Sequence, residues 1–199
     1  MKTRLKTTYQ HLCSLLLGLV TISQPVLAKD LTAFALIKEG NRYVGEQSKD
    51  KVVQIRSEKS IGSLNPNIWY VVYHDPDATL KVIEVKFGAG QKLGVKRPAR
   101  LLEPITKANE PLPGEKLKID SDKALNIASK EPLLKNLTLK ASRLTLERRS
   151  KGDPMPVWKV RFWAAKLKNP DDNSDIGEVI VSGEDGTVLK IDLKPAHVD

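Results

Sequence analysis

Cysteine is nearly absent from this chain of 199 residues, in which Cys13 stands alone. One cysteine excludes an internal disulfide framework and any zinc site built from several thiolates. Aromatic residues are also scarce, at 5% of the sequence with three tryptophans. Apolar residues nevertheless amount to 40%, which is enough for a packed core and excludes a wholly disordered chain.

Long apolar runs are scarce as well, and the one near the N-terminus is short. Residues 2–6 carry three basic side chains and no acid, an apolar run covers 12–20, and small or aliphatic residues follow at 26–28. These are the three parts of a secretory signal peptide, whereas a membrane-spanning helix needs about 20 apolar residues. We therefore expect residues 1–28 to be a signal peptide and the protein to be exported to the periplasm or the extracellular space. We expect no stable membrane insertion after the signal is removed.

Acidic residues are outnumbered, but no block of one sign stands out. The chain has 33 Lys and Arg against 24 Asp and Glu, a formal net charge of +9. Basic and acidic residues alternate in stretches such as 110–123, so the excess is spread along the chain. We expect no nucleic-acid partner, because surfaces that bind nucleic acids concentrate Lys and Arg.

The sequence after the predicted signal contains an internal repeat, in which the second copy follows the first at an offset of 89 residues. The pattern Trp-x-Val-x-aromatic occurs at 69–73 and again at 158–162, and the Ala-Leu pair at 35–36 recurs at 124–125. Tryptophan is so rare here that the matching triplets favour a duplication. The alternative is two unrelated α+β pieces of similar length.

Each copy is predicted to begin with a helix and to continue with four strands. Helical spacing of apolar residues covers 31–44 in the first copy, and in the second it begins at Ser121 as N-cap and ends before Pro132. Alternation and turn signals predict strands at 52–57, 68–74, 79–87, 92–96, 137–148, 157–165, 176–182 and 187–193. The predicted fold class is therefore α+β, with two tandem units that are each a helix packed on a four-stranded antiparallel sheet. The predicted boundaries are 29–98 for the first unit, 99–119 for a proline-rich linker and 120–199 for the second unit.

The second copy resembles a PepSY-type domain. The likeness rests on the Ala-Leu core of the helix at 121–128, the Trp-x-Val strand at 156–162, the strand at 177–181 and the Asp-Gly turn at 185–189. The first copy matches less well, because its turn at 88–90 lacks the acidic residue. The tandem arrangement is also similar in architecture to the beta-lactamase inhibitory protein. The resemblance implies two PepSY-like units in a non-enzymatic exported module that binds or restrains peptidases or other envelope proteins.

Motifs that carry catalysis are missing from the sequence. His74 and His197 are the two histidines after the signal, and neither has a third metal ligand in its neighbourhood. The acidic loop at 171–175 lacks the glycine and the distant glutamate of a calcium-binding loop, and the glycines at 88–90 lack dinucleotide-binding spacing. We expect no enzyme activity, no catalytic residues, no metal and no cofactor.

The strand predicted at 157–165 suggests a protein-binding surface. Its period of two points Lys159, Arg161 and Trp163 away from the helix, and Tyr70 does the same in the first copy. Aromatic side chains flanked by cations are typical of protein-binding hot spots. The alternative is that the other copy or the linker covers this face.

The function favoured by these observations is an exported, non-enzymatic binding or inhibitory module that acts on a peptidase or another envelope protein. The alternative is a structural or accessory envelope protein without inhibitory activity.

Overall fold

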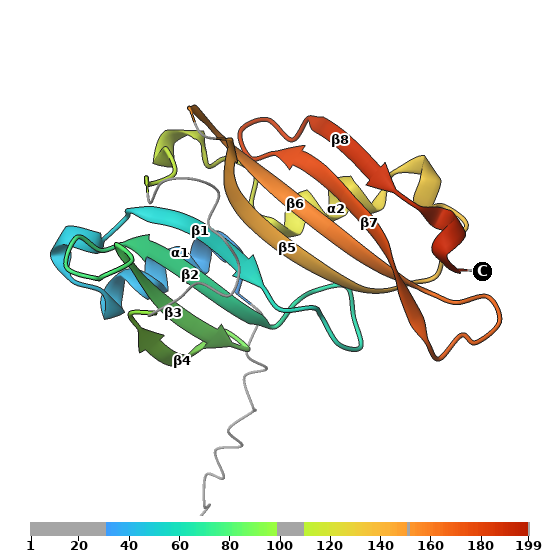
Figure 1. The fold of residues 1–199 in the computed structure, drawn as a ribbon, viewed down its shortest axis with the longest axis horizontal. Coiled ribbons are helices and arrows are strands. Elements are labelled where there is room, and N and C mark those ends of the chain that lie inside the picture. Colours follow the sequence, from blue (N-terminus) through green and yellow to red (C-terminus); the bar gives the residue numbers. More distant parts are fainter. Residues whose placement is uncertain (1–30, 99–109, 151, 199) are drawn as a thin grey trace, which may run out of the picture.

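The computed structural model describes residues 31–98, 110–150 and 152–198, and in these residues the strands form one antiparallel sheet of eight strands (Figure 1). The order across the sheet is β4-β3-β2-β1-β5-β6-β7-β8. The first half comprises α1 (Ala33–Gly40), β1 (Val52–Ser57), β2 (Ile68–His74), β3 (Val82–Gly88) and β4 (Gln91–Lys96). The second half comprises α2 (Ser121–Ser129), β5 (Leu139–Ser150), β6 (Asp153–Ala165), β7 (Asn173–Ser182) and β8 (Val188–Leu193). Short 3₁₀ turns cover Asn41–Tyr43, Glu46–Ser48, Gly114–Lys116, Pro132–Leu134 and Pro195–Val198.

The predicted fold class is wrong. The sequence predicted two units with separate sheets, whereas β1 and β5 pair and join all the strands into one sheet. Ile55 lies opposite Leu146, and Arg56 lies opposite Thr145. The first strand of a meander is an edge strand with unpaired backbone groups, and the pairing of two such edges satisfies those groups. The result is a mostly β fold with α-helices of only eight and nine residues.

Serine side chains extend the seam between β1 and β5 beyond its short backbone ladder. The Leu144 N–H donates to Ser57 Oγ at 2.9 Å, and the Ser142 N–H donates to Ser60 Oγ at 2.8 Å. The Ser142 hydroxyl in turn donates to the Leu64 carbonyl at 2.6 Å. All three serines are buried. Their hydroxyls therefore pair backbone groups that would otherwise lack partners in the interior.

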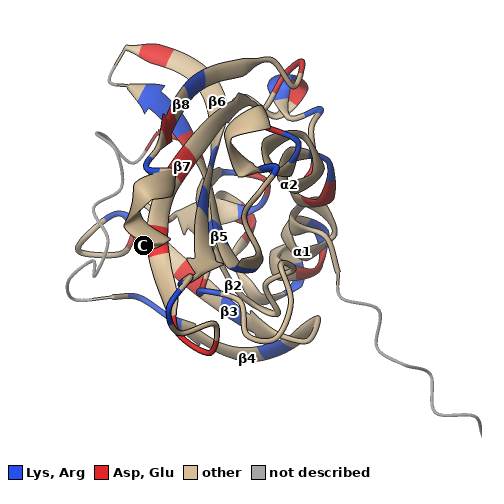
Figure 2. Cartoon of the chain, turned by 90° about the vertical axis from the view of Figure 1, so that its right-hand side faces the viewer, with Lys and Arg blue, Asp and Glu red and all other residues tan. Residues whose placement is uncertain are grey.

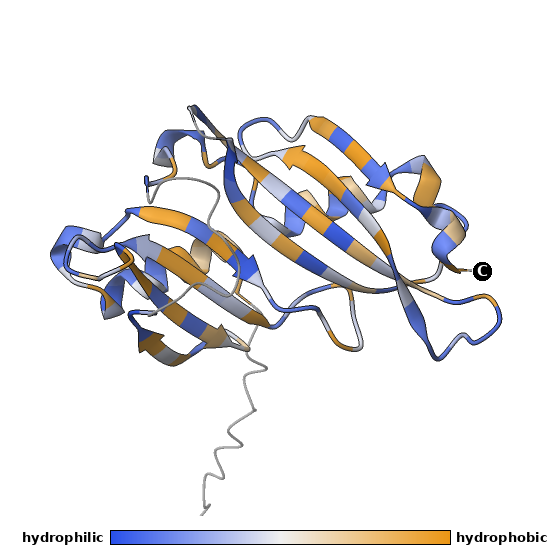
Figure 3. Ribbon diagram, in the orientation of Figure 1, coloured by the Kyte–Doolittle hydropathy of each residue, from blue (hydrophilic) through white to orange (hydrophobic). Residues whose placement is uncertain are grey.

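Both α-helices lie on the same face of the sheet (Figure 2). One apolar core beneath them includes residues of both halves, and the strands alternate between hydrophobic and hydrophilic residues (Figure 3). Trp69 and Trp158 occupy corresponding places, each buried in the second strand of its half. Each indole N–H donates to a backbone carbonyl, of Pro66 at 2.9 Å and of Ile119 at 2.7 Å.

The helix N-termini are joined in a way that the sequence did not predict. Asp120, rather than Ser121, is the N-cap of α2, and its carboxylate accepts a hydrogen bond from the Ser121 N–H at 2.7 Å. The same carboxylate accepts from the Phe34 N–H at 3.1 Å, while Ser121 Oγ accepts from the Ala33 N–H at 3.0 Å. The cap residue of α1, Thr32, makes no side-chain cap bond. Acceptors from the second half thus satisfy free N–H groups of the first helix.

Part of the predicted linker at 99–119 packs on the sheet. Residues 99–109 lie outside the described residues, as does the predicted signal peptide at 1–28. Leu112 is buried, and its N–H donates to the Val52 carbonyl at 2.6 Å. In the part of the chain that the structure describes, no helix has the length and apolar character needed to cross a membrane.

Candidate protein-binding face

The sheet face opposite α1 and α2 carries the four residues predicted to bind a partner, and neither α-helix lies over it (Figure 2). We call this surface the helix-free face. Lys159, Arg161 and Trp163 reach it from β6, since the residues between them are buried in the core. Tyr70 reaches it from β2, between the core residues Trp69 and Val71. All four predicted residues are half-buried.

One row of paired residues crosses the helix-free face from β3 to β8, and we call it the basic row. Each member is the cross-strand partner of the next, in the order Lys86, Tyr70, Arg56, Thr145, Lys159, Ile180 and Lys190. Its cations come from β3, β1, β6 and β8, which are alternate strands of the sheet. Since neighbouring strands lie about 4.8 Å apart, successive cations are spaced by about 10 Å. The row contains no acid.

Tyr70 is held between two cations of the basic row. The Arg56 guanidinium carbon lies 4.6 Å from the centre of the ring and Lys86 Nζ lies 5.0 Å from it, both within cation–π range. The phenol donates to Glu58, which also pairs with Lys86 at 3.0 Å. Hydrogen bonds from Tyr70 and Lys86 hold the pKa of Glu58 below its usual value, so this carboxylate stays charged.

Two buried carboxylates lie beside the row on the same face of the sheet and orient its central cations. The side chain of Glu84 is 3% exposed, and it pairs with Arg56 and, at 3.1 Å, with Lys96. The side chain of Glu147 is 5% exposed and pairs with Lys159. A buried charge must be paired, so each carboxylate fixes its partner. Lys96 and Lys159 are the accessible members, at 59% and 36% exposed, whereas Arg56 is only 11% exposed.

The structure brings three of the four predicted residues together and leaves the fourth apart. Arg161 Nε lies 3.1 Å from the Asp175 carboxylate, and Lys59 Nζ lies 4.7 Å from the centre of the Trp163 ring. Tyr70 shares the basic row with Lys159 but is three strands away, which is about 14 Å. The predicted residues therefore mark two ends of one surface rather than a single cluster.

Two shallow hollows flank the basic row. One of about 240 Å³ has Arg56 and Lys96 in its wall, and the other of about 280 Å³ has Lys159 and Arg161. Arg143 lines both hollows. Sites for small ligands usually enclose about 300–1,000 Å³ and are mostly apolar. These smaller, charged hollows suit the side chains of a partner better than an enclosed small molecule.

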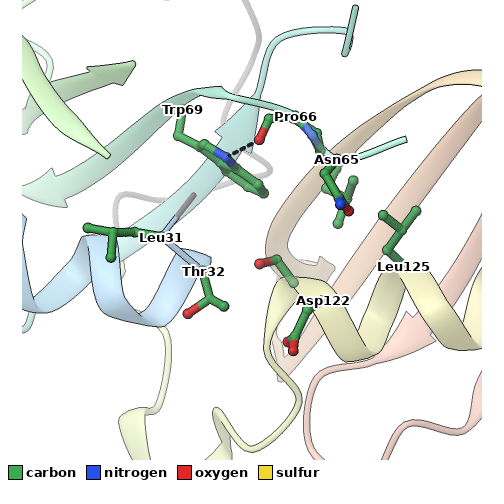
Figure 4. Close-up of a pocket in the computed structure, with 9 residues that line it drawn as sticks. Leu31, Thr32, Asn65, Pro66, Trp69, Asp122 and Leu125 are labelled. Atoms are coloured by element: carbon green, nitrogen blue, oxygen red, sulfur yellow. Dashed lines mark hydrogen bonds between the residues drawn. The ribbon is translucent and has the colours of Figure 1, made fainter. Parts of the chain in front are cut away.

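A third cavity, of about 230 Å³, lies on the opposite side of the sheet, where the two helices begin (Figure 4). Its apolar wall includes Trp69 and Leu125, and Asp122 is the one ionisable residue among those that line it. General acid–base catalysis in one site calls for positioned groups that exchange protons. A single exposed carboxylate at an apolar wall does not provide such a pair.

Sequence reasoning missed the larger part of this surface. The same period of two that selected Tyr70 also places Arg56 and Lys86 on the helix-free face, but their grouping needs the strand register. The sequence does not predict that Glu84 and Glu147 are buried partners of these cations, because charged residues in strands are usually exposed. Among the described residues, no group of three or more His, Cys, Asp and Glu side chains could hold a metal ion.

Comparison of the chain with protein-family models, with curated proteins and with solved structures finds no significant match. The resemblance to a PepSY-type domain therefore stays a prediction. The case for a binding site rests on the geometry of the helix-free face.

Proposed function

We propose that this chain is an exported, non-enzymatic binding module that docks on a peptidase or another envelope protein through its helix-free face and restrains it. The observation that carries the proposal is the basic row, with an aromatic ring held between two cations. Aromatic and basic side chains in a fixed arrangement are common anchors of protein interfaces, because little side-chain entropy is lost on binding. The sequence pattern of a signal peptide supports export.

The test is affinity capture from the exported fraction with three forms of the protein. These are the natural chain, the double variant Tyr70→Ala/Trp163→Ala, and Tyr43→Ala as the matched control. Tyr43 lies outside the helix-free face, yet it also donates to a glutamate and has a lysine 5.0 Å from its ring centre. We expect the control to retain the partner and the double variant to lose it, with binding weakened about 30-fold or more, as for interface hot spots.

Two further measurements complete the test. Equal urea midpoints for the three forms would show that the loss of binding is not a loss of folding. Addition of the protein to the captured partner is expected to lower the partner's hydrolytic activity. Capture that is unchanged in the double variant would contradict docking through this face, and hydrolytic activity of the purified chain itself would contradict a non-enzymatic module.

A further inference from the structure

We infer that the partner presents an acidic segment whose carboxylates recur about every 10 Å, in register with the cations of the basic row. This inference rests on the proposed function, because it names the chemistry of the partner that the helix-free face would bind. The geometry comes from the pairing of the strands, which places Lys86, Arg56, Lys159 and Lys190 on alternate strands of one row. Six strand spacings separate the first cation from the last, which is about 29 Å.

The acids that neutralise the central cations do not face a partner. Glu84 and Glu147, which pair with Arg56 and Lys159, are buried, and Arg56 itself is only 11% exposed, so Lys159 is the accessible cation of these two pairs. Lys96 adds a further exposed cation at the same carboxylate as Arg56. At the two ends of the row the acids are exposed, so we expect those cations to contribute less. Charge complementarity therefore favours an acidic occupant at the seam between the halves.

The spacing of the cations favours a protein over a nucleic acid. A polyproline II segment has three residues per turn and rises about 3.1 Å per residue, so every third residue lies on one side at intervals of about 9.3 Å. A Glu-Pro-Pro repeat thus matches the row. Phosphates along a strand of duplex DNA follow each other at about 3.4 Å along the axis, which is much finer than the spacing of the row.

The test measures binding of two labelled peptides of the same composition to the full exported chain by fluorescence anisotropy. In the first peptide four glutamates are separated by Pro-Pro pairs, and in the second four glutamates are consecutive and six prolines follow. We expect the spaced peptide to bind at least about fivefold more tightly, and both affinities to fall as salt rises because the contacts are between charges. Equal affinities would overturn the inference, and so would tighter binding of a single-stranded oligonucleotide.

The variant of the basic row is chosen so that folding and net charge stay constant. Lys159→Gln alone would take from the buried Glu147 its lysine partner and leave only the hydrogen bond from Gln54, and the loss of one partner of a buried ion pair is strongly destabilising. The double variant Lys159→Gln/Glu147→Gln keeps two polar side chains together and leaves the net charge unchanged. We expect it to bind the spaced peptide about fivefold more weakly, as for the loss of one good charged contact. The control Lys92→Gln lowers the net charge by one at a lysine beside Tyr43, outside the row, and is expected to bind normally.

The outcomes separate this inference from the proposed function. If the spaced peptide fails to bind while Tyr70→Ala/Trp163→Ala still loses the captured partner, the helix-free face binds a protein that is not acidic and the inference is wrong. If the double variant Lys159→Gln/Glu147→Gln binds the spaced peptide as well as the natural chain does, the basic row is not the site. If both the peptide and the capture experiments fail, the proposed function fails as well.

Discussion

The two halves of the sheet bury similar side chains on the helix side but differ on the helix-free face. In the first half the strands have six or seven residues, and Val53, Val72 and Val82 form a small second apolar cluster on the helix-free face. In the second half β5 to β7 have 10 to 13 residues, and the outward positions of β6 include Lys159 and Arg161. Packing against a helix constrains the buried face, so similar apolar positions recur there. The outward face is not held by that packing, and there the residues of the two halves differ.

The largest expected effect comes from the two tryptophans that occupy corresponding places. Trp158 is fully buried, whereas Trp69 is 5% exposed and lines the cavity where the helices begin. Truncation of a buried tryptophan to alanine costs about 3–5 kcal/mol of unfolding free energy. We expect Trp158→Ala to lie at the upper end of that range and Trp69→Ala at the lower end, because an open cavity lets water fill the space.

Urea unfolding followed by far-UV circular dichroism measures both effects, with the half-buried Trp163→Ala as control. An equal loss of unfolding free energy in Trp69→Ala and Trp158→Ala would show that the two halves are packed equally tightly. A loss below about 1 kcal/mol for Trp158→Ala would contradict its place in the core.

The next effect concerns the seam, which is where the halves depend on each other. Ser57→Ala removes the acceptor of the buried Leu144 N–H, and a buried donor left without a partner costs about 1–3 kcal/mol. Ser129→Ala in α2 is the control, since the Ser129 hydroxyl bonds the Asn126 carbonyl at an exposed site. It is expected to change stability by less than about 0.5 kcal/mol. The same urea measurement checks both variants. If Ser57→Ala lost as little unfolding free energy as the control, the seam serines would not be needed for stability.

The sequence predicted individual strands far better than their assembly. The ranges 52–57 and 68–74 agree with β1 and β2, because alternating apolar residues and flanking turns are local signals. The pairing of β1 with β5 joins residues about ninety positions apart, and no local pattern contains it. The prediction of Ser121 as the N-cap of α2 is wrong by one residue, because the Ser121 hydroxyl accepts a hydrogen bond from the other helix and Asp120 caps α2.

The candidate site also has a part that the sequence predicted and a part that it could not predict. Period two placed Lys159, Arg161 and Trp163 on one face of β6, which is a property of a single strand. The basic row is a property of the register between strands, so Arg56 and Lys86 could not be joined to Lys159 from the sequence. The signal peptide, the export and the boundaries at 29–98, 99–119 and 120–199 remain predictions.

The smallest expected effect compares two aspartates at turns, one in each half, through the pH dependence of stability. Burial works to raise the pKa of Asp75, but hydrogen bonds from Arg97 at 2.7 Å and from the Asp77 N–H at 3.0 Å outweigh it, and the pKa is lowered. In the second half, hydrogen bonds from the Thr187 N–H and Ser182 lower the pKa of Asp185. Both carboxylates therefore stabilise the fold most in their ionised form.

The sign of the effect follows from the lowered pKa of Asp75. The stabilisation that the Asp75 carboxylate provides is fully present above its pKa in the unfolded chain, which is about 3.9. It is lost as the pH falls through the lower pKa of Asp75 in the folded protein. Asp75→Asn should be less stable than the natural chain at pH 7, and the difference should shrink below about pH 4. We expect the same direction but a smaller change for Asp185→Asn, because its exposed charge is screened by solvent whereas Asp75 is buried. Urea midpoints at pH 3 to 7 would measure this, and a pH-independent difference for Asp75→Asn would show that the variant acts through packing rather than charge.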